Sequence, residues 1–288
     1  MKVAFVGLGV MGYPMAGHLQ SAGHDVCVYN RSPAKVESWL ADYAGRGAAT
    51  PALAASGAEI VFTCVGNDDD VRAVVLGEEG VAKSLTTGAL LVDHTTTSAA
   101  LARELSVALG ERGIQFLDAP VSGGQAGAEN GALTIMAGGE FDAFQRALPI
   151  MDCYARCARR LGDSGSGQLA KMVNQICIAG VVQGLAEGLA FAERAGLDGA
   201  AVIEVISQGA AQSWQMENRY ETMLAGNYEH GFAVDWMRKD LAIVLEEASR
   251  LQLALPVAEL VNGFYGDVQA MGGGRWDTSS LLVRMQRG

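Results

Sequence analysis

Short apolar runs alternate with longer amphipathic segments over the first 162 residues. Six runs rich in β-branched residues predict strands at 3–6, 25–29, 60–65, 90–93, 115–119 and 133–137. Segments with helical spacing of apolar positions lie between or after them, at 11–22, 33–41, 69–76, 98–111 and 141–151. Strands that alternate with helices in this way predict an α/β domain built on a parallel sheet.

The pattern changes after the Gly- and Ser-rich segment 162–167, because no later segment alternates with period two for long. One long helix is predicted over 167–195, and further helices begin near Asp198, near Ala233 and after Pro256, with a last short one at 277–285. We therefore expect two domains, an α/β domain over 1–162 and an all-helical domain over 163–288, joined by the long helix.

Charge and composition exclude several classes of protein. The 21 Lys and Arg residues against 32 Asp and Glu give a net charge of −11, which argues against binding nucleic acid or an anionic membrane surface. The apolar stretch 176–191 is shorter than the roughly 20 residues of a bilayer span, so no membrane segment is expected. Five scattered cysteines and no secretory signal pattern point to free thiols in the cytoplasm. We expect no metal site, and we interpret the acidic run 68–70 as the start of a helix.

Glycine is in excess, with 37 of 288 residues, and three glycines stand where backbone geometry has a known use. The motif Gly7-Leu8-Gly9-Val10-Met11-Gly12 follows the first predicted strand and opens a helix. In this context the first glycine allows a tight turn, the second lets the backbone approach a pyrophosphate, and the third brings helix against strand. The first domain is therefore predicted to be a Rossmann-type dinucleotide-binding domain.

The second predicted strand ends at Asn30-Arg31-Ser32, where an NAD-selective enzyme usually carries an acidic residue for the ribose 2′-hydroxyl. No acid is present there. Asn30 suits the ribose, while Arg31 and Ser32 offer donors to a 2′-phosphate. We predict NADP as the preferred cofactor, with NAD possible; the alternative is that Arg31 is a solvated turn residue.

Gly180, Gly184 and Gly188 recur every fourth residue on the long helix and share one side of it. This spacing predicts close packing against another helix or a partner subunit, and a buried Ala- and Gly-rich helix is an equal alternative. The long helix is so apolar that the remaining residues of the second domain are too few to cover it. We therefore expect a homodimer or homotetramer.

Four separated blocks resemble the β-hydroxyacid dehydrogenase family, which includes 3-hydroxyisobutyrate dehydrogenase, tartronate semialdehyde reductase and the glyoxylate/succinic semialdehyde reductases. The blocks are Gly7-Leu-Gly-Val-Met-Gly-Tyr-Pro-Met-Ala16, Asp118-Ala-Pro-Val-Ser-Gly-Gly124, Gly165-Ser-Gly-Gln-Leu-Ala-Lys-Met-Val-Asn-Gln175 and Lys239-Asp240-Leu241. The resemblance covers essentially the whole chain and implies hydride transfer between a nicotinamide cofactor and a small carboxylate substrate, a 3-hydroxy acid or an aldehyde acid.

The resemblance also implies a set of site residues. Lys171 is implied as the general acid or base, with Asn174 and Ser122 completing the catalytic set. The implied substrate contacts are Ser122, Gly123, Gly124, Lys171, Asn174 and Gln175. The glycine loop and residues 30–32 are implied cofactor contacts, and the others are Val65, Gly66, Asp70, Thr96 and Lys239. At the position of Gly66 the family usually has a proline.

Two other functions remain open from the sequence. The first is a cofactor-binding regulator without turnover, which would lack a lysine at the position of Lys171. The second is an imine reductase on a similar fold, which usually carries another residue at that position. The substrate itself, the direction of the reaction in the cell and the choice between dimer and tetramer are not determined by these motifs. Trp214 and Trp236 are candidates for shaping a substrate pocket, but a place in the core or at an interface is the favoured interpretation for both.

Overall fold

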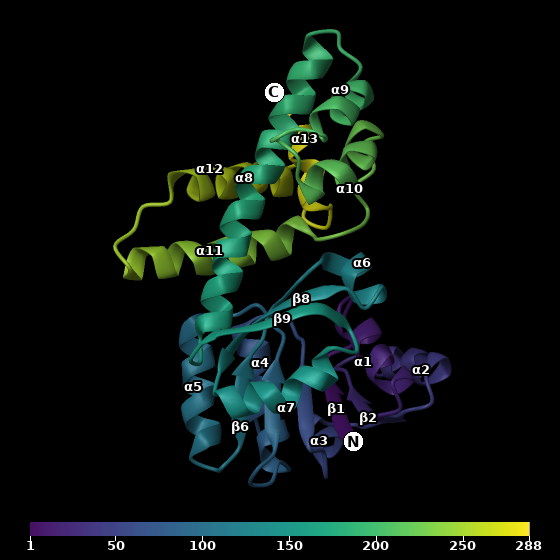
Figure 1. Ribbon diagram of the computed structural model, residues 1–288, viewed down its shortest axis with the longest axis vertical. Helices are drawn as coiled ribbons and strands as arrows, with labels where there is room; N and C mark the ends of the chain where they lie inside the picture. Colours follow the sequence, from purple (N-terminus) through teal and green to yellow (C-terminus); the bar gives the residue numbers. More distant parts are fainter. Residues whose placement is uncertain (288) are drawn as a thin grey trace. The chain divides into compact units, whose positions relative to one another are not determined.

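The computed structural model describes residues 1–287 and divides into two compact units, Met1–Lys171 and a second unit from Met172 onward. The first unit contains a nine-stranded sheet and the second is helical within the described residues. Each unit is described separately below (Figure 1).

The sheet of the first unit has the strand order β3-β2-β1-β4-β5-β6-β8-β7, with β9 paired to β8. Its strands are β1 Lys2–Val6, β2 Asp25–Tyr29, β3 Arg46–Gly47, β4 Ile60–Thr63, β5 Leu90–Asp93, β6 Gln115–Asp118, β7 Val121–Ser122, β8 Leu133–Gly139 and β9 Ala155–Gly162. Strands β1 to β6 pair in parallel, which confirms the predicted α/β architecture.

Helices cover both faces of this sheet. Its helical elements are α1 Gly12–Ser21, α2 Pro33–Asp42, α3 Pro51–Ala55, α4 Asp68–Leu76, η1 Val81–Lys83, α5 Ala99–Gly110, α6 Gly124–Glu129 and α7 Phe141–Met151. Successive residues of β1 point to opposite faces of the sheet. Phe5 packs in one core with α1, α2, α6 and α7, whereas Val6 packs in the other core with α3, α4 and α5. Parallel strands buried on both faces need no polar alternation, which is why they read as continuous apolar runs.

The sheet departs from the prediction at its far edge. Strand β8 runs antiparallel to β6 and β7, and β9 extends the sheet beyond β8. We did not predict β9, because none of its residues is buried and it carries Arg156, Arg159 and Arg160, so it lacks the apolar run of a buried strand. The two-residue strands β3 and β7 and the short helices α3 and α6 are likewise too short to give a periodic signal.

The second unit contains most of α8 and the helices after it. The elements are α8 Ser166–Arg194, α9 Gly199–Ile206, α10 Trp214–Leu224, α11 Val234–Arg250, α12 Pro256–Ala270, η2 Thr278–Ser280 and α13 Leu281–Arg287. The core of this unit joins α8 to α11 and α12, with Leu185, Leu241 and Tyr265 among its buried members. The sequence pattern did not reveal α10, which is polar over much of its length and buries only Met216 and Met223.

Close packing of a second helix on the glycines of α8 is not what the described chain shows. A methyl group added at Gly184 or Gly188 would meet no atom within 4 Å, and one at Gly180 would meet only Val257, at 4.0 Å. Gly184 and Gly188 are exposed, so the helix is not buried on all sides either. They line a surface groove with Glu187, Ala190, Phe191, Arg194 and Met285.

Helix α8 is also the one described helix long and apolar enough to cross a membrane by length and composition. The core helices of soluble proteins meet the same criterion, and 44% of its most apolar window is buried inside this structure. The length and composition of α8 therefore do not by themselves distinguish a membrane span from a core helix.

Candidate active site

The predicted cofactor residues follow the carboxyl ends of parallel strands. Strand β1 leads into Gly7, β2 into Asn30, β4 into Val65 and β5 into Thr96. Because these strands are parallel neighbours, their carboxyl ends share one edge of the sheet. The chain order reverses beside β1, which lies between β2 and β4, and such a switch point is where open α/β sheets bind ligands.

The three glycines of the first loop have different roles. A methyl group at Gly7, where φ is +104°, would overlap the carbonyl oxygen of Cys64, and one at Gly12 would overlap the carbonyl oxygen of Gly7. Both glycines are thus required by the fold. A methyl group at Gly9 would meet nothing within 4 Å, so the space above it is open to a ligand. The loop ends at the first turn of α1, which has no acidic residue, and its N–H groups suit a pyrophosphate.

Asn30 braces the glycine loop. Its Oδ1 accepts the N–H of Leu8 at 2.9 Å, and its Nδ2 donates to the carbonyl oxygen of Ser32 at 3.2 Å. The side chain therefore joins the loops after β1 and β2, in addition to the ribose contact that the sequence predicts. Arg31, next to it, leaves 88% of its side chain exposed and lies 3.5 Å from Asp70.

The loops after β4 and β5 are joined to each other. The N–H of Val65 donates to Thr95 Oγ1 at 3.0 Å, and the N–H of Thr95 donates to Asp93 Oδ1 at 3.1 Å. Thr63 Oγ1 donates to the same carboxylate oxygen at 2.7 Å. Asp93 thereby supports the segment that carries Thr96.

Three titratable groups are buried beneath these loops. Burial raises the pKa of Asp93 and of Asp118 from 3.8 to about 6, although hydrogen bonds to both carboxylates oppose the shift. Burial lowers the pKa of His94 from 6.5 to about 4. His94 Nδ1 lies 2.6 Å from the carbonyl oxygen of Ala119, which can only accept, so Nδ1 carries the proton and Nε2 accepts from Tyr154 Oη at 2.8 Å.

The predicted carboxylate-binding loop follows β6. Ser122 ends β7, and Gly123 and Gly124, with φ of +133° and +62°, turn the backbone into α6. An L side chain rarely adopts these angles, so the turn favours glycine at both positions. A methyl group at Gly124 would meet nothing within 4 Å, and the backbone is therefore open to a ligand there.

Asp118 and Gln168 fix the first turn of α8 to the sheet, a role that we did not predict for either. Asp118 Oδ1 accepts the N–H of Gly165 at 2.7 Å, and its Oδ2 accepts the N–H of Gln168 at 3.0 Å. The Gln168 amide accepts from the N–H of Thr97 at 3.0 Å and donates to the carbonyl oxygen of Thr95 at 2.8 Å. Both residues stand inside the motif blocks of the sequence, but nothing in those blocks indicates that they contact each other.

Lys171 is buried one turn further along α8, and Asn174 and Gln175 follow it at helical spacing. The Gln175 amide is used inside the protein: its Oε1 accepts from Asn174 Nδ2 at 2.8 Å and its Nε2 donates to Asp240 Oδ2 at 2.7 Å. Gln175 therefore orients Asn174, and the substrate contact that the resemblance implies for Gln175 stays a prediction.

Asp240 connects this helix to α11. It is buried, and its Oδ1 lies 3.2 Å from Lys239 Nζ. Lys239 also lies over the ring of Trp236, 5.9 Å from its centre. The aromatic candidate Trp214 contacts Arg219 in the same way, with 5.0 Å between the guanidinium carbon and the ring centre.

The acidic run at the start of α4 is part of a helix terminus, as predicted. Asn67 caps the helix, since its Oδ1 accepts the N–H of Asp70 at 2.9 Å, and Asp68, Asp69 and Asp70 occupy the first turn. Over the described residues, no group of three or more His, Cys, Asp or Glu side chains could hold a metal ion.

A Rossmann sheet with an open glycine loop at its switch point is typical of a dinucleotide-binding domain, and comparison with known proteins identifies the family. Residues 2–162 match the family described as the NAD binding domain of 6-phosphogluconate dehydrogenase. Residues 165–285 match the family described as NAD-binding of NADP-dependent 3-hydroxyisobutyrate dehydrogenase. The chain belongs to the β-hydroxyacid dehydrogenase family.

Individual relatives span the whole chain. An uncharacterized oxidoreductase of Shewanella frigidimarina is 65% identical, covering 99% of this chain and 98% of that protein. The 2-hydroxy-3-oxopropionate reductase of Escherichia coli is 33% identical over 99% of this chain and 97% of its own. The crystal structure of 3-hydroxyisobutyrate dehydrogenase from Salmonella typhimurium is also 33% identical, covers 99% of both chains and superposes with a TM-score of 0.89. The protein is therefore an NAD(P)-dependent oxidoreductase of the hydroxyacid dehydrogenase type.

The open space at Gly9 predicts that Gly9→Ala impairs cofactor binding without unfolding the protein. The added methyl group meets no protein atom, so the free energy of unfolding should stay within about 1 kcal/mol of the wild-type value. It would occupy space that the pyrophosphate needs, and we expect the dissociation constant of NADPH to rise at least about tenfold, or about 1.4 kcal/mol. Denaturant unfolding and a fluorescence titration with NADPH measure the two quantities.

Gly12→Ala is the control, because its methyl group overlaps the Gly7 carbonyl and should lower stability by about 1–3 kcal/mol. Unimpaired NADPH binding by Gly9→Ala would contradict the assignment of this loop.

Burial of Asp93 predicts a pH-dependent stability difference. A carboxyl whose pKa is raised in the folded state stabilises the protein fully below its unfolded pKa and loses that contribution as the pH rises through 6. Asp93→Asn retains an oxygen acceptor for Thr63 and Thr95 but does not ionise. Its free energy of unfolding, relative to wild type, should therefore increase by about 2 kcal/mol between pH 4 and pH 7.

Urea unfolding of both proteins at several pH values measures this change, and titration of His94 cancels because both proteins contain it. If the difference in unfolding free energy between the two proteins is constant with pH, burial does not raise the pKa of Asp93.

Proposed function

We propose that the protein transfers a hydride between NADP(H) and a small 3-hydroxy acid or the corresponding aldehyde acid. The observation that carries this proposal is the placement of Lys171, buried one turn after the point where Asp118 and Gln168 attach α8 to the loops after β5 and β6. The names of the Escherichia coli and Salmonella relatives, a reductase and a dehydrogenase of small oxygenated acids, support the same substrate class.

Each part of the site has a distinct task in this proposal. The nicotinamide, when bound, accepts or supplies the hydride. Lys171 exchanges a proton with the oxygen on the β-carbon of the substrate, a step that general acid–base catalysis accelerates by about 10²–10⁴-fold. Ser122 and the backbone N–H groups at Gly123 and Gly124 hold the substrate carboxylate. Asn174, held by Gln175, orients the substrate.

The preference for NADP is supported by the turn after β2. It carries no acidic residue, and the exposed guanidinium of Arg31 can reach a 2′-phosphate through charge-assisted hydrogen bonds. Ser32 precedes α2 and makes no capping hydrogen bond with its side chain, so its hydroxyl supports the same role.

The groove on α8 supports association of two copies. Glu187 and Arg194 line the groove two helical turns apart, and Gly188 between them and Gly184 before them leave room for a second backbone. In a two-fold pairing of antiparallel helices, Glu187 of one copy faces the partner's Arg194 and the reverse contact forms by symmetry. Phe191, with 73% of its surface exposed, would be covered in such a dimer.

Phe191→Glu should therefore shift the protein toward the monomer. Light scattering coupled to size-exclusion chromatography measures the mass, which we expect to be that of a dimer or tetramer for wild type and to fall by at least a factor of two in the variant. Phe141→Glu is the control, because Phe141 is similarly exposed at 59% but lies in the α/β unit. A monomeric wild-type protein would contradict the proposal.

The role of Lys171 predicts a large loss of turnover without a loss of cofactor. Lys171→Ala should lower kcat for NADPH oxidation with small aldehyde acids by at least about 10²-fold, the usual effect of removing a general acid. The NADPH dissociation constant should stay within about twofold, since the assigned cofactor contacts lie mainly in the loops after β1 to β5. The reverse reaction is measured with 3-hydroxyisobutyrate, L-serine and glycerate.

Wild-type turnover with none of these substrates, together with NADPH binding, would favour a cofactor-binding regulator. Retained turnover in Lys171→Ala would remove Lys171 from the mechanism and reopen imine reduction as the alternative.

A further inference from the structure

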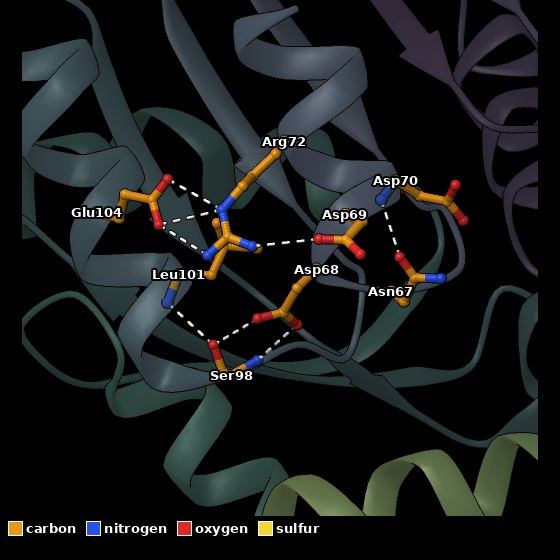
Figure 2. Close-up of polar contacts among 8 residues, drawn as sticks. All are labelled: Asn67, Asp68, Asp69, Asp70, Arg72, Ser98, Leu101 and Glu104. Carbon is orange, nitrogen blue, oxygen red and sulfur yellow. Dashed lines mark hydrogen bonds and ion pairs between the residues drawn. The ribbon is translucent and has the colours of Figure 1, made fainter.

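The three aspartates at the start of α4 have different partners. Asp68 accepts hydrogen bonds from the backbone and hydroxyl of Ser98, and Asp69 lies 3.5 Å from Arg72. Figure 2 shows these two side chains on the side of Ser98 and Arg72, whereas Asp70 points away from that cluster. Asp70 instead lies 3.5 Å from Arg31.

This pair brings together two segments that flank the glycine loop. Arg31 follows β2 and Asp70 follows β4, and these strands lie on either side of β1 in the sheet. The Arg31 side chain is 88% exposed and that of Asp70 is 33% exposed. The guanidinium that is proposed to bind the 2′-phosphate thus has a carboxylate beside it, supplied by another loop and not by the end of β2.

We propose that Asp70 limits how strongly this protein prefers NADP over NAD, an inference that rests on the proposed use of Arg31 for the 2′-phosphate. A phosphate monoester carries a charge of about −1.5 to −2 at pH 7. Asp70 repels that charge and also offsets the positive charge of Arg31. The 2′-hydroxyl of NAD is uncharged, so the same carboxylate has little effect on it.

The size of the effect follows from the separation of the charges. Two unit charges 4 Å apart interact by about 1 kcal/mol in water, which corresponds to about fivefold in a dissociation constant. An exposed ion pair of this length contributes little to ordering Arg31, so the loss of that ordering should not cancel the gain. Removal of the Asp70 charge should therefore strengthen NADPH binding.

Asp70→Asn tests this proposal, and Asp69→Asn is the matched control. Both changes remove one negative charge from the same helical turn, but Asp69 is 96% exposed and faces Arg72. Neither change removes the N–H that Asn67 caps. Binding of NADPH and of NADH is measured by calorimetry at low ionic strength, with no substrate and no turnover.

We expect Asp70→Asn to bind NADPH about fivefold more tightly than wild type, with NADH unchanged within about twofold. Asp69→Asn should change neither by more than about twofold. At 0.5 M NaCl the gain in Asp70→Asn should shrink, because the Debye length falls to about 4 Å. Weaker NADPH binding in Asp70→Asn, or a gain equal to that in Asp69→Asn, would overturn the proposal.

Arg31→Ala separates this proposal from the one on which it rests. If Arg31→Ala binds NADPH as tightly as wild type, Arg31 is not the phosphate contact and the proposed cofactor preference fails too. If Arg31→Ala loses NADPH affinity while Asp70→Asn equals Asp69→Asn, only the role of Asp70 is overturned.

Discussion

The carboxylate of Asp118 is the constraint on which the candidate site depends. It ends β6 and accepts backbone N–H groups from Gly165 and Gln168, at the start of α8. The first N–H groups of a helix have no partner within the helix, and a buried carboxylate there satisfies them and suits the positive end of the helix dipole. These two hydrogen bonds, together with those of Gln168, hold the first turn of α8 against the sheet, and Lys171 follows within the same unit.

The same edge of the sheet collects the loops for the cofactor. Parallel strands deliver the glycine loop, the Asn30 turn and the segments at Val65 and Thr96 to one side, and side-chain hydrogen bonds from Asn30 and Thr95 connect neighbouring loops. A protein with a net charge of −11 can in this way offer backbone N–H groups and a few cations to a small anion. The overall charge excludes polyanions and leaves local anion sites open.

Buried ionisable groups beneath these loops oppose one another as the pH changes. Asp93 and Asp118, with a raised pKa, favour the folded state more as the pH falls toward 4. His94, with a lowered pKa, favours it less over a similar range, because the unfolded chain takes up the proton that the buried imidazole does not. All three have hydrogen-bond partners in neighbouring strands or loops, so these segments keep their arrangement despite the burial of polar groups.

The sequence by itself determined the two-domain architecture, most element positions in the parallel sheet, and the family, because long apolar periodicities and the four motif blocks are local properties of the chain. It did not reveal β9, which contains no buried residue, or α10, which buries only two residues. The substrate contact that the resemblance implies for Gln175 stays a prediction. Only the tertiary structure showed that Gln175 bonds Asp240, that Asp118 and Gln168 attach α8 to the sheet, and that Asp70 stands beside Arg31. The partners in these contacts are separated by 39 to 73 residues along the chain, and no local pattern encodes which distant side chains meet.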